Sequence, residues 1–424
     1  MPEARKPITE FRTFIDGLND ARCDEYLGQP HSAIADEEAF SQVQAYLRDY
    51  YSGVESVHSF LDVNGSVFDC IPIEQQYALR RRSGSLPQPP ELPVGLARPS
   101  DDVSKRVIQL HENFVDRLGN RMFCPDGSIP VQRLTLPWLA RFANLTAFLG
   151  KYYDRRHRSL PPVAVQYAPL LNDIHQWAVG EQSVENHGGG AVLNVWDPVP
   201  AYPPQLMSLS QVWFASADRQ QTVEAGWQVN PYRYPHTKPV LFCYWTSYSA
   251  GHCYNLLCPG FVQTDNTWML GGALPSWSSP GGAQIELAVA YRLEVDKWWL
   301  IVDGTCVGYY PTSLFQTGTL GTKADLMLCG GEVATSSGTS WPPMGSGEFA
   351  AEHYGRVAYS KQIQSITLGG ATKDASLQVR NNGHAECYTA IAANYRVSKD
   401  PHTLAPWNET LWFGGTPPAS CQCA

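Results

Sequence analysis

The chain is 424 residues long, and 43% of its residues are hydrophobic and 12% aromatic, which is enough for a sizeable core and favours two domains. It has 31 Lys and Arg residues against 40 Asp and Glu residues, a formal net charge of -9. This acidic excess argues against a nucleic-acid-binding surface. No apolar run reaches the ~18 residues of a membrane-spanning helix, and the first residues lack the apolar region of a signal peptide. We therefore expect neither a nucleic-acid nor a membrane partner.

The first 60 residues are expected to be mainly helical. Apolar residues recur at spacings of three and four from Phe40 to Tyr50, which places them on one helix face. The acidic run 36–38 comes just before, and negative charge is favourable at a helix N-terminus. This pattern predicts a helix that packs one ordinary apolar face against a core.

The next hundred residues mix short elements. A strand with a turn at Asn64-Gly65 follows the helical start, and residues 80–99 are rich in Pro, Ser and Arg, which is typical of a loop. Residues 103–121 and 138–153 are again expected to be helical. Together with the helical start, these elements predict a small α+β domain over residues 1–160.

Residues 154–162 join a basic run to Pro161-Pro162. Proline disfavours helix at the preceding residue and has no N–H to donate, so this stretch should be extended and exposed. We interpret residues 161–185 as a linker between two domains. A plain solvated linker accounts for this composition.

From residue 186 onward the helical periodicity disappears. Short β-branched and aromatic runs alternate with clusters of Gly, Pro, Ser and Asn, which is an all-β pattern. Residues 284–294 and 298–303 read as two strands joined by a turn at 295–297, which predicts a hairpin. There are more such strands than one open sheet carries comfortably. The fold class we expect is therefore mainly β, with an antiparallel β-sandwich over residues 186–424 preceded by the smaller α+β domain.

Two glutamates stand in strand-like stretches that are rich in glycine and aromatic residues. Strand alternation over residues 222–229 places Glu224, Gly226 and Gln228 on one face and the apolar residues with Trp227 on the other. Glu332 follows a Gly-Gly pair, and glycine in a strand lets a ligand backbone approach closely. This pattern indicates acid–base hydrolysis, although a strand glutamate is more often a solvated surface residue.

Ordered motifs along the chain resemble the neprosin family, whose members are glutamic peptidases that cleave after proline. The upstream half also resembles the family's activation region, through residues 69–71 and 124–133. The resemblance implies that Glu224 and Glu332 are the catalytic pair, that residues 1–160 form an activation domain, and that the protein is secreted. It also offers a second interpretation of the linker, as a segment that the enzyme itself cuts after Pro161 or Pro162 during activation. The downstream motifs are Val195-Trp196-Asp197-Pro198, Ser208-Leu209-Ser210-Gln211-Val212-Trp213, the Glu224 stretch, residues 253–263, Gly308-Tyr309-Tyr310-Pro311, the Glu332 stretch and Met344-Gly345-Ser346-Gly347.

The eleven cysteines include several that are placed for useful bridges. Cys253 and Cys258 close a short loop, and the resemblance supports that bridge. It also suggests that Cys387 pairs with Cys421 or Cys423, and Cys70 with Cys124 is a third candidate. Oxidised cysteines indicate an extracellular location. A zinc site built on Cys387, Cys421, Cys423 and His384 is the alternative, but one residue between thiolates departs from usual zinc spacing, so we expect no metal.

Amide hydrolysis needs a base for the water, an acid for the leaving nitrogen and donors for the oxyanion. The two glutamates can supply the first two functions, and if they lie close they share a proton at acidic pH. The candidate donors are Gln228, Tyr248 and the main-chain amides near Gly330 and Gly331. Trp227 is the candidate flat wall for a proline ring. We therefore expect a monomeric, cofactor-free endopeptidase made as a zymogen, most active at acidic pH on proline-containing peptides and proteins.

Other chemistries have less support in the sequence. Motifs for a zinc helix, a serine nucleophile elbow, a dinucleotide fold and a phosphate loop are absent. His252 beside Cys253 could indicate a cysteine nucleophile, but the disulfide explains that cysteine better. A glycoside hydrolase using the same two carboxylates and a non-catalytic carbohydrate-binding β-sandwich remain the rival interpretations.

Overall fold

The computed structural model describes residues 7–80, 86–98, 102–151, 174–248, 250–336, 340–351, 353–381, 386–418 and 421. The chain forms two compact units that are not contiguous in sequence. The first unit comprises Met1–Ser85, Gln109–Asn172 and Cys253–Ala273. The second comprises Leu86–Ile108, Asp173–His252 and Leu274–Ala424.

The helices of the first unit are α1 (Phe11–Asp20), α2 (Glu37–Tyr50), α3 (Leu136–Leu139) and α4 (Leu145–Leu149). The prediction for α2 is confirmed, because its apolar face is buried and the Asp36 side chain caps it by accepting the Ala39 N–H. The helix expected over residues 103–121 is wrong: apart from the 3-10 turn Val103–Lys105, that stretch is irregular. There the Asp116 carboxylate accepts the backbone N–H groups of Leu118 and Asn120, which stabilises a turn in place of a helix.

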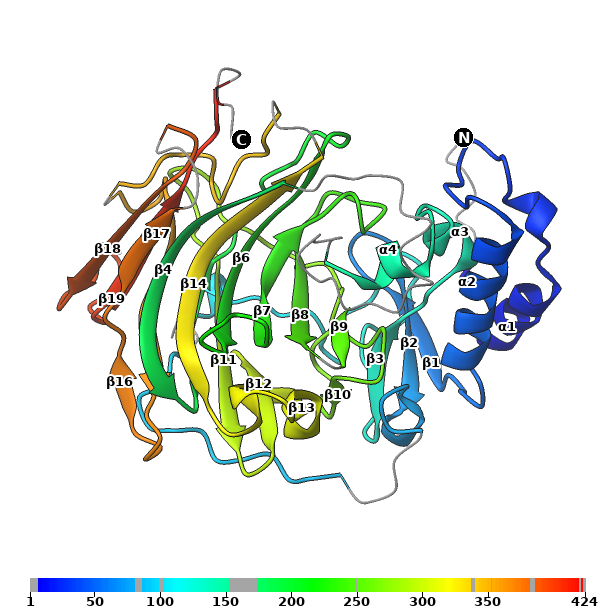
Figure 1. Ribbon diagram of the computed structural model, residues 1–424, viewed down its shortest axis with the longest axis horizontal. Coiled ribbons are helices and arrows are strands. Elements are labelled where there is room, and N and C mark those ends of the chain that lie inside the picture. Colours follow the sequence, from blue (N-terminus) through cyan, green and yellow to red (C-terminus); the bar gives the residue numbers. More distant parts are fainter. Residues whose placement is uncertain are drawn as a thin grey trace. The chain divides into compact units, whose positions relative to one another are not determined.

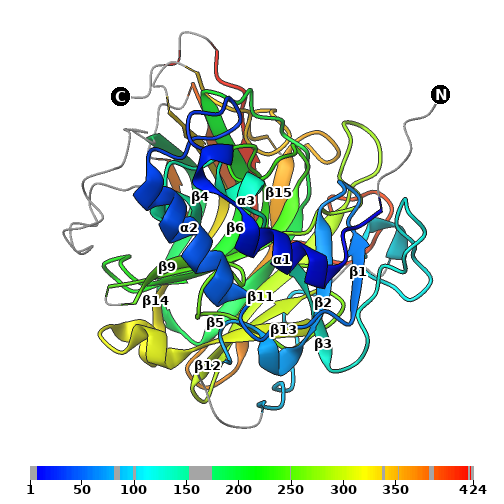
Figure 2. The same cartoon turned by 90° about the vertical axis from the view of Figure 1, so that its right-hand side faces the viewer.

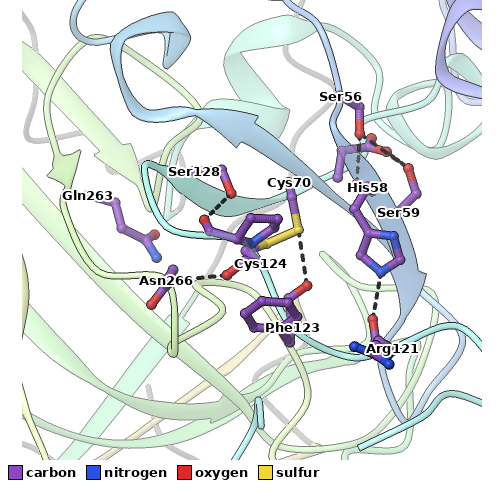
Figure 3. The surroundings of a disulfide bond; sticks show 12 residues. Ser56, His58, Ser59, Cys70, Arg121, Phe123, Cys124, Ser128, Gln263 and Asn266 are labelled. Carbon is purple, nitrogen blue, oxygen red and sulfur yellow. Dashed lines mark hydrogen bonds between the residues drawn. A yellow bond between two sulfur atoms is a disulfide. The ribbon is translucent and has the colours of Figure 1, made fainter. Parts of the chain in front are cut away.

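Three short antiparallel strands accompany these helices, in the order β1 (His58–Leu61), β2 (Val67–Pro72) and β3 (Ser128–Gln132) (Figure 2). The predicted disulfide between Cys70 and Cys124 is confirmed, and it belongs to a buried cluster with Phe60 and Phe68 of these strands (Figure 3). Beside it the Asn266 side chain donates to the Cys124 carbonyl at 2.9 Å. The small α+β unit expected at the front of the chain is thus present.

A segment from far downstream, residues 253–273, completes the first unit. Gln76 holds it by two hydrogen bonds, since its Nε2 donates to the Gln263 carbonyl and its Oε1 accepts the Gln263 N–H. Gln109 makes the same kind of clamp with the Gly272 carbonyl and the Met269 N–H. The segment carries β10 (Val262–Gln263) and the confirmed disulfide between Cys253 and Cys258.

The second unit is built on two antiparallel sheets (Figure 1). The strands of sheet I run in the order β17 (Gln378–Asn381), β4 (Ile174–Asn186), β14 (Ala324–Thr335), β6 (Gln205–Ala215), β7 (Thr222–Val229) and β8 (Val240–Ser247), and β9 (Gly251–Tyr254) comes next in the chain. Long bent strands β4 and β14 lie side by side in it. Residues 174–185, which we placed in a linker, therefore belong to β4.

The strands of sheet II run in the order β13 (Thr305–Pro311), β12 (Lys297–Val302), β11 (Glu286–Glu294), β5 (Gly188–Asn194), β15 (Ala358–Ile366), β19 (Asn408–Gly414) and β18 (Thr389–Tyr395), and β16 (Thr372–Asp374) pairs with β15. The predicted hairpin is confirmed as β11 and β12. Its turn is tight, since Val295 adopts a positive φ of 57°. A disulfide joins Cys387 to Cys421, which confirms that pairing and removes both thiolates from the zinc alternative.

The core of the second unit lies between the two sheets. Phe214 of β6 packs on Tyr291 and Trp298 of sheet II, with ring centroids 6.3 and 6.2 Å apart. The Tyr291 hydroxyl donates to the main-chain carbonyl of Glu224 at 3.0 Å. The expected antiparallel β-sandwich and mainly β fold class are therefore confirmed.

A strap formed by residues 86–98 and 102–108 covers the face of sheet II that is turned away from sheet I. Leu96 packs against Ala290 and Ile301, and Lys105 forms an ion pair with Asp400. Part of the stretch expected to belong to the front domain therefore belongs to the second unit. No described helix is long and apolar enough to cross a membrane.

Candidate active site

Strand β7 directs its two sets of side chains as the alternation predicted. The Trp227 indole N–H donates to the Asn194 carbonyl of β5 at 3.1 Å, so this side chain lies inside the sandwich. Glu224 points to the opposite side of sheet I. This corrects the expectation that Trp227 forms a pocket wall next to Glu224, because strand alternation turns the two side chains to opposite faces.

We call the side of sheet I that is turned away from sheet II the glutamate face. Register places both glutamates on it: Glu224 pairs with Trp213 of β6, Trp213 pairs with Leu328 of β14, and Glu332 lies four residues beyond Leu328. The face is formed by His175, Trp177, Val179 and Glu181 of β4, Leu328, Gly330 and Glu332 of β14, Leu209, Gln211 and Trp213 of β6, and Thr222, Glu224, Gly226 and Gln228 of β7.

The same register separates the two glutamates. Strand β6 lies between β7 and β14, and the rows of Glu224 and Glu332 are four residues apart along the strands. On a flat sheet, two strand spacings and four residue rises put the two Cα atoms roughly 16 Å apart. The glutamates therefore share a face without being neighbours in the sheet, and the expectation of a closely coupled pair has no support from the register.

Gln211 lies midway between the glutamates. Its partners in register are Gly226 on one side and Gly330 on the other, so Gln211 supplies the only side chain of this row across the three strands. A Cβ at Gly226 would collide with the Ser210 carbonyl oxygen, and Gly330 has a φ of 134°. Both positions thus favour glycine for backbone reasons, and the result is a low strip between the two carboxylates.

Glu332 is buried and has side-chain partners on the strands at both sides. His175 Nδ1 of β4 lies 2.9 Å from Oε1, and Gln211 Nε2 of β6 donates to Oε2 at 3.3 Å. The His175 ring stacks on Trp177 with the centroids 5.5 Å apart and the planes 22° apart. Each carboxylate oxygen therefore faces a nitrogen whose position is fixed by the sheet.

Glu224 has a different environment. Thr222 donates its hydroxyl to Oε1 at 2.7 Å, and the same hydroxyl lies 3.0 Å from that of Thr246 on β8. Trp213 is the neighbour in register on β6 and belongs to a buried apolar cluster with Leu328. Glu224 thus lies beside a flat apolar surface at this end of the glutamate face.

The remaining predicted residues are only partly brought together. Gln228 lies on the glutamate face in the row of Glu332, with Leu209 between them, and its Oε1 accepts a hydrogen bond from Asn230. Tyr248 lies one residue beyond β8, and 41% of its surface is exposed. The structure therefore keeps Gln228 near the candidate site, and no contact among the described residues joins Tyr248 to it.

Gly330 and Gly331 lie in β14, which pairs with β4 on one side and β6 on the other. Backbone N–H groups of such a central strand point within the sheet toward its neighbours. The expectation that these two amides face an oxyanion therefore has no support from the strand pairing. A Cβ at Gly331 would instead meet Met344 and Phe413, so packing explains the glycine.

The sequence-based prediction missed His175 and Gln211. His175 fell in the stretch interpreted as a linker, and no periodicity marked it. Gln211 stood in one of the motifs of the family resemblance, and its alternation with Trp213 would have placed it on a common face. Among the described residues no group of three or more His, Cys, Asp or Glu side chains is arranged to hold a metal ion.

A family model described as Neprosin matches residues 204–416, which is 213 of the 424 residues. The chain belongs to the neprosin family. The matched range includes Glu224, Glu332 and Gln211, whereas β4 with His175 lies outside it. Family membership supports a peptidase-type function for this chain.

Proposed function

We propose that this neprosin-family chain is a glutamic endopeptidase that hydrolyses peptide bonds after proline. The observation that carries the proposal is that Glu224 and Glu332 lie on one face of one sheet, on either side of Gln211. Strands fix the backbone positions of all three residues, which suits a site that must hold reacting groups in place.

The reaction requires a base and an acid. One glutamate, as a carboxylate, takes a proton from a water molecule while the water oxygen attacks the peptide carbonyl carbon. The other, as a carboxylic acid, gives a proton to the nitrogen as the C–N bond breaks. Proton exchange with solvent restores both groups.

The separation of the two glutamates shapes this mechanism. Charges so far apart interact weakly near a protein surface, so we do not require the shared proton that the sequence suggested. We place the peptide carbonyl and the water over Gln211, between the carboxylates. An amide nitrogen carries two N–H donors, which makes Gln211 our candidate for stabilising the oxyanion in place of Gly330 and Gly331.

Selectivity for proline fits the surroundings of Glu224. Trp213, Leu328 and Val179 belong to one buried apolar cluster, and Trp177 packs against it. A pyrrolidine ring is rigid and apolar and is recognised well by flat aromatic surfaces. We therefore assign the proline subsite to this cluster and leave Trp227 out of it.

We further propose that residues 1–160 act as an activation region and that the protein is secreted. Three disulfides fit an oxidising compartment. The expected cleavage positions at Pro161 and Pro162 lie outside the described residues. A chain beginning near Asn186 would lack most of β4 and the strap of residues 86–98 and 102–108, so activation is tested on the full-length protein by comparing its specific activity before and after acid treatment.

The direct test is digestion of a peptide library between pH 3 and pH 8, with cleavage products identified by mass spectrometry. We expect the wild type to cut on the carboxyl side of proline, with the highest cleavage rate at acidic pH. Glu332→Gln should show no cleavage above background. An oligosaccharide panel run in parallel addresses the glycosidase alternative. Hydrolysis of sugars with no peptide cleavage at any pH would overturn the proposal.

A further inference from the structure

The contact between His175 and Glu332 assigns separate functions to the two glutamates. We propose that His175 is a positioning residue that holds the Glu332 carboxylate as the general base, which leaves the acid function to Glu224. This inference rests on the proposed peptidase function. It concerns a residue of β4, a strand that the family match does not reach.

The first support is the geometry of the contact. His175 Nδ1 is 2.9 Å from Glu332 Oε1, and the two side chains are only 10% and 3% exposed. Gln211 donates to the other oxygen at 3.3 Å. Both partners can donate to carboxylate oxygens, so the arrangement suits a carboxylate whose orientation is held while it receives a proton from water.

The second support is the way His175 is held. Its ring stacks on Trp177, and Trp177 is the neighbour in register of Glu332. The indole thus restrains the imidazole plane beside the carboxylate. Residues that fix the orientation of a reacting group in this manner contribute through geometry without touching the substrate.

The third support is charge. Histidine is the side chain that gains a proton between about pH 5 and pH 7. When Glu332 takes the water proton, its negative charge moves to the peptide oxygen, and a cation beside Glu332 stabilises that charge before and after the transfer.

The other charged groups of the glutamate face are farther from His175. Glu181 lies six residues from His175 on β4 and is engaged by Arg219 at 2.5 Å, with Arg380 of β17 at 3.9 Å. Glu224 lies on β7, beyond β14 and β6. Among the described residues of this face, Glu332 is therefore the charged group directly beside His175.

The test compares pH profiles of His175→Asn and His175→Leu. Asparagine places an amide nitrogen near the position of Nδ1 and cannot titrate, whereas leucine removes the donor. His187→Asn is the matched control, because His187 lies at the junction of β4 and β5. All variants are assayed after the same acid treatment on one proline-containing peptide.

We expect His175→Leu to lower kcat by about 100-fold with little change in KM. His175→Asn should retain activity within about tenfold at the acidic optimum and lose the decline of kcat/KM between pH 6 and pH 8. His187→Asn should keep the wild-type profile.

A wild-type profile in His175→Asn would show that His175 only packs and would overturn the inference. Such a result with an active wild type and an inactive Glu332→Gln leaves the proposed peptidase function intact. Absence of peptide cleavage by the wild type at every pH overturns both. If His175→Leu fails to fold, the shape of the His175→Asn profile still decides.

Discussion

The two units bury carboxylates in contrasting ways. In the first unit Asp69 is locked by a bidentate contact with Arg133, at 2.8 and 2.5 Å, and by the Ser59 hydroxyl at 2.6 Å. In the second unit Glu332 faces a histidine and an amide, neither of which carries a permanent charge. Burial alone therefore does not mark a reactive carboxylate. The chemistry of its partners distinguishes a structural ion pair from a group that can exchange protons.

Buried glutamines show the same contrast. Gln76 and Gln109 of the first unit bond to backbone groups of residues 253–273 and so tie distant parts of the chain together. Gln211 of the second unit bonds to the side chain of Glu332. The first two amides satisfy backbone groups and stabilise the fold, whereas the amide of Gln211 is directed at a carboxylate on a sheet face.

The largest predicted effect is a loss of stability of the first unit in Arg133→Met. This substitution leaves the Asp69 carboxylate buried without its cation and removes the contacts of Arg133 with the rings of Phe11 and Phe14. Breaking a buried pair from one side costs about 3–5 kcal/mol. Hydrogen exchange should accelerate in β2 and stay unchanged in β6. Arg121→Met is the control, because Arg121 is exposed. Unchanged exchange in β2 of Arg133→Met would contradict a structural ion pair.

Local patterns in the sequence predicted local structure well. The helical spacing that ends at Tyr50 gave α2, and strand alternation placed Glu224 and Trp227 on opposite faces. The hairpin of β11 and β12 followed from two apolar runs around a turn. In each case the residues that determine the element are neighbours in the chain.

Features that depend on distant contacts were not predictable in the same way. Residues 253–273 enter the first unit through side chain-to-backbone clamps, which leave no periodic signal. Strand β4 was interpreted as a linker, and the pairing with β14 that makes it a strand is visible only in three dimensions. For this reason His175 was missed, although the resemblance had already indicated Glu332.

A smaller, pH-dependent change in stability is expected from Asp303→Asn in the second unit. Burial raises the pKa of Asp303 to about 7, because desolvation outweighs the hydrogen bond from the Ala288 N–H and the attraction of Arg106. Its Oδ2 finds no hydrogen-bond partner among the described residues. A raised folded-state pKa means that this group supports stability fully below about pH 4 and loses that support as the pH rises through about 7.

The free energy of unfolding of Asp303→Asn should therefore match that of the wild type near pH 4 and exceed it by about 1–3 kcal/mol at pH 8. One pKa unit corresponds to ~1.4 kcal/mol, and an unpaired amide costs part of the gain. Denaturant melts at the two pH values measure this difference. The control is Asp296→Asn, whose side chain is 62% exposed in the adjacent turn. Equal stability of Asp303→Asn and wild type at pH 8 would show that the Asp303 carboxylate is adequately solvated or paired.

The central claim is that Glu224 and Glu332 are reactive, whereas other buried carboxylates are structural. Glu181 provides a matched control on the same face, because it is buried and paired with Arg219. The decisive measurement is kcat/KM for peptide cleavage by Glu224→Gln, Glu332→Gln and Glu181→Gln, alongside their melting temperatures. We predict losses of at least about 1,000-fold for the first two at unchanged Tm, and activity within a few-fold of wild type for Glu181→Gln. Retention of more than a few per cent of activity by Glu224→Gln or Glu332→Gln, or an equal loss in Glu181→Gln, would contradict the account.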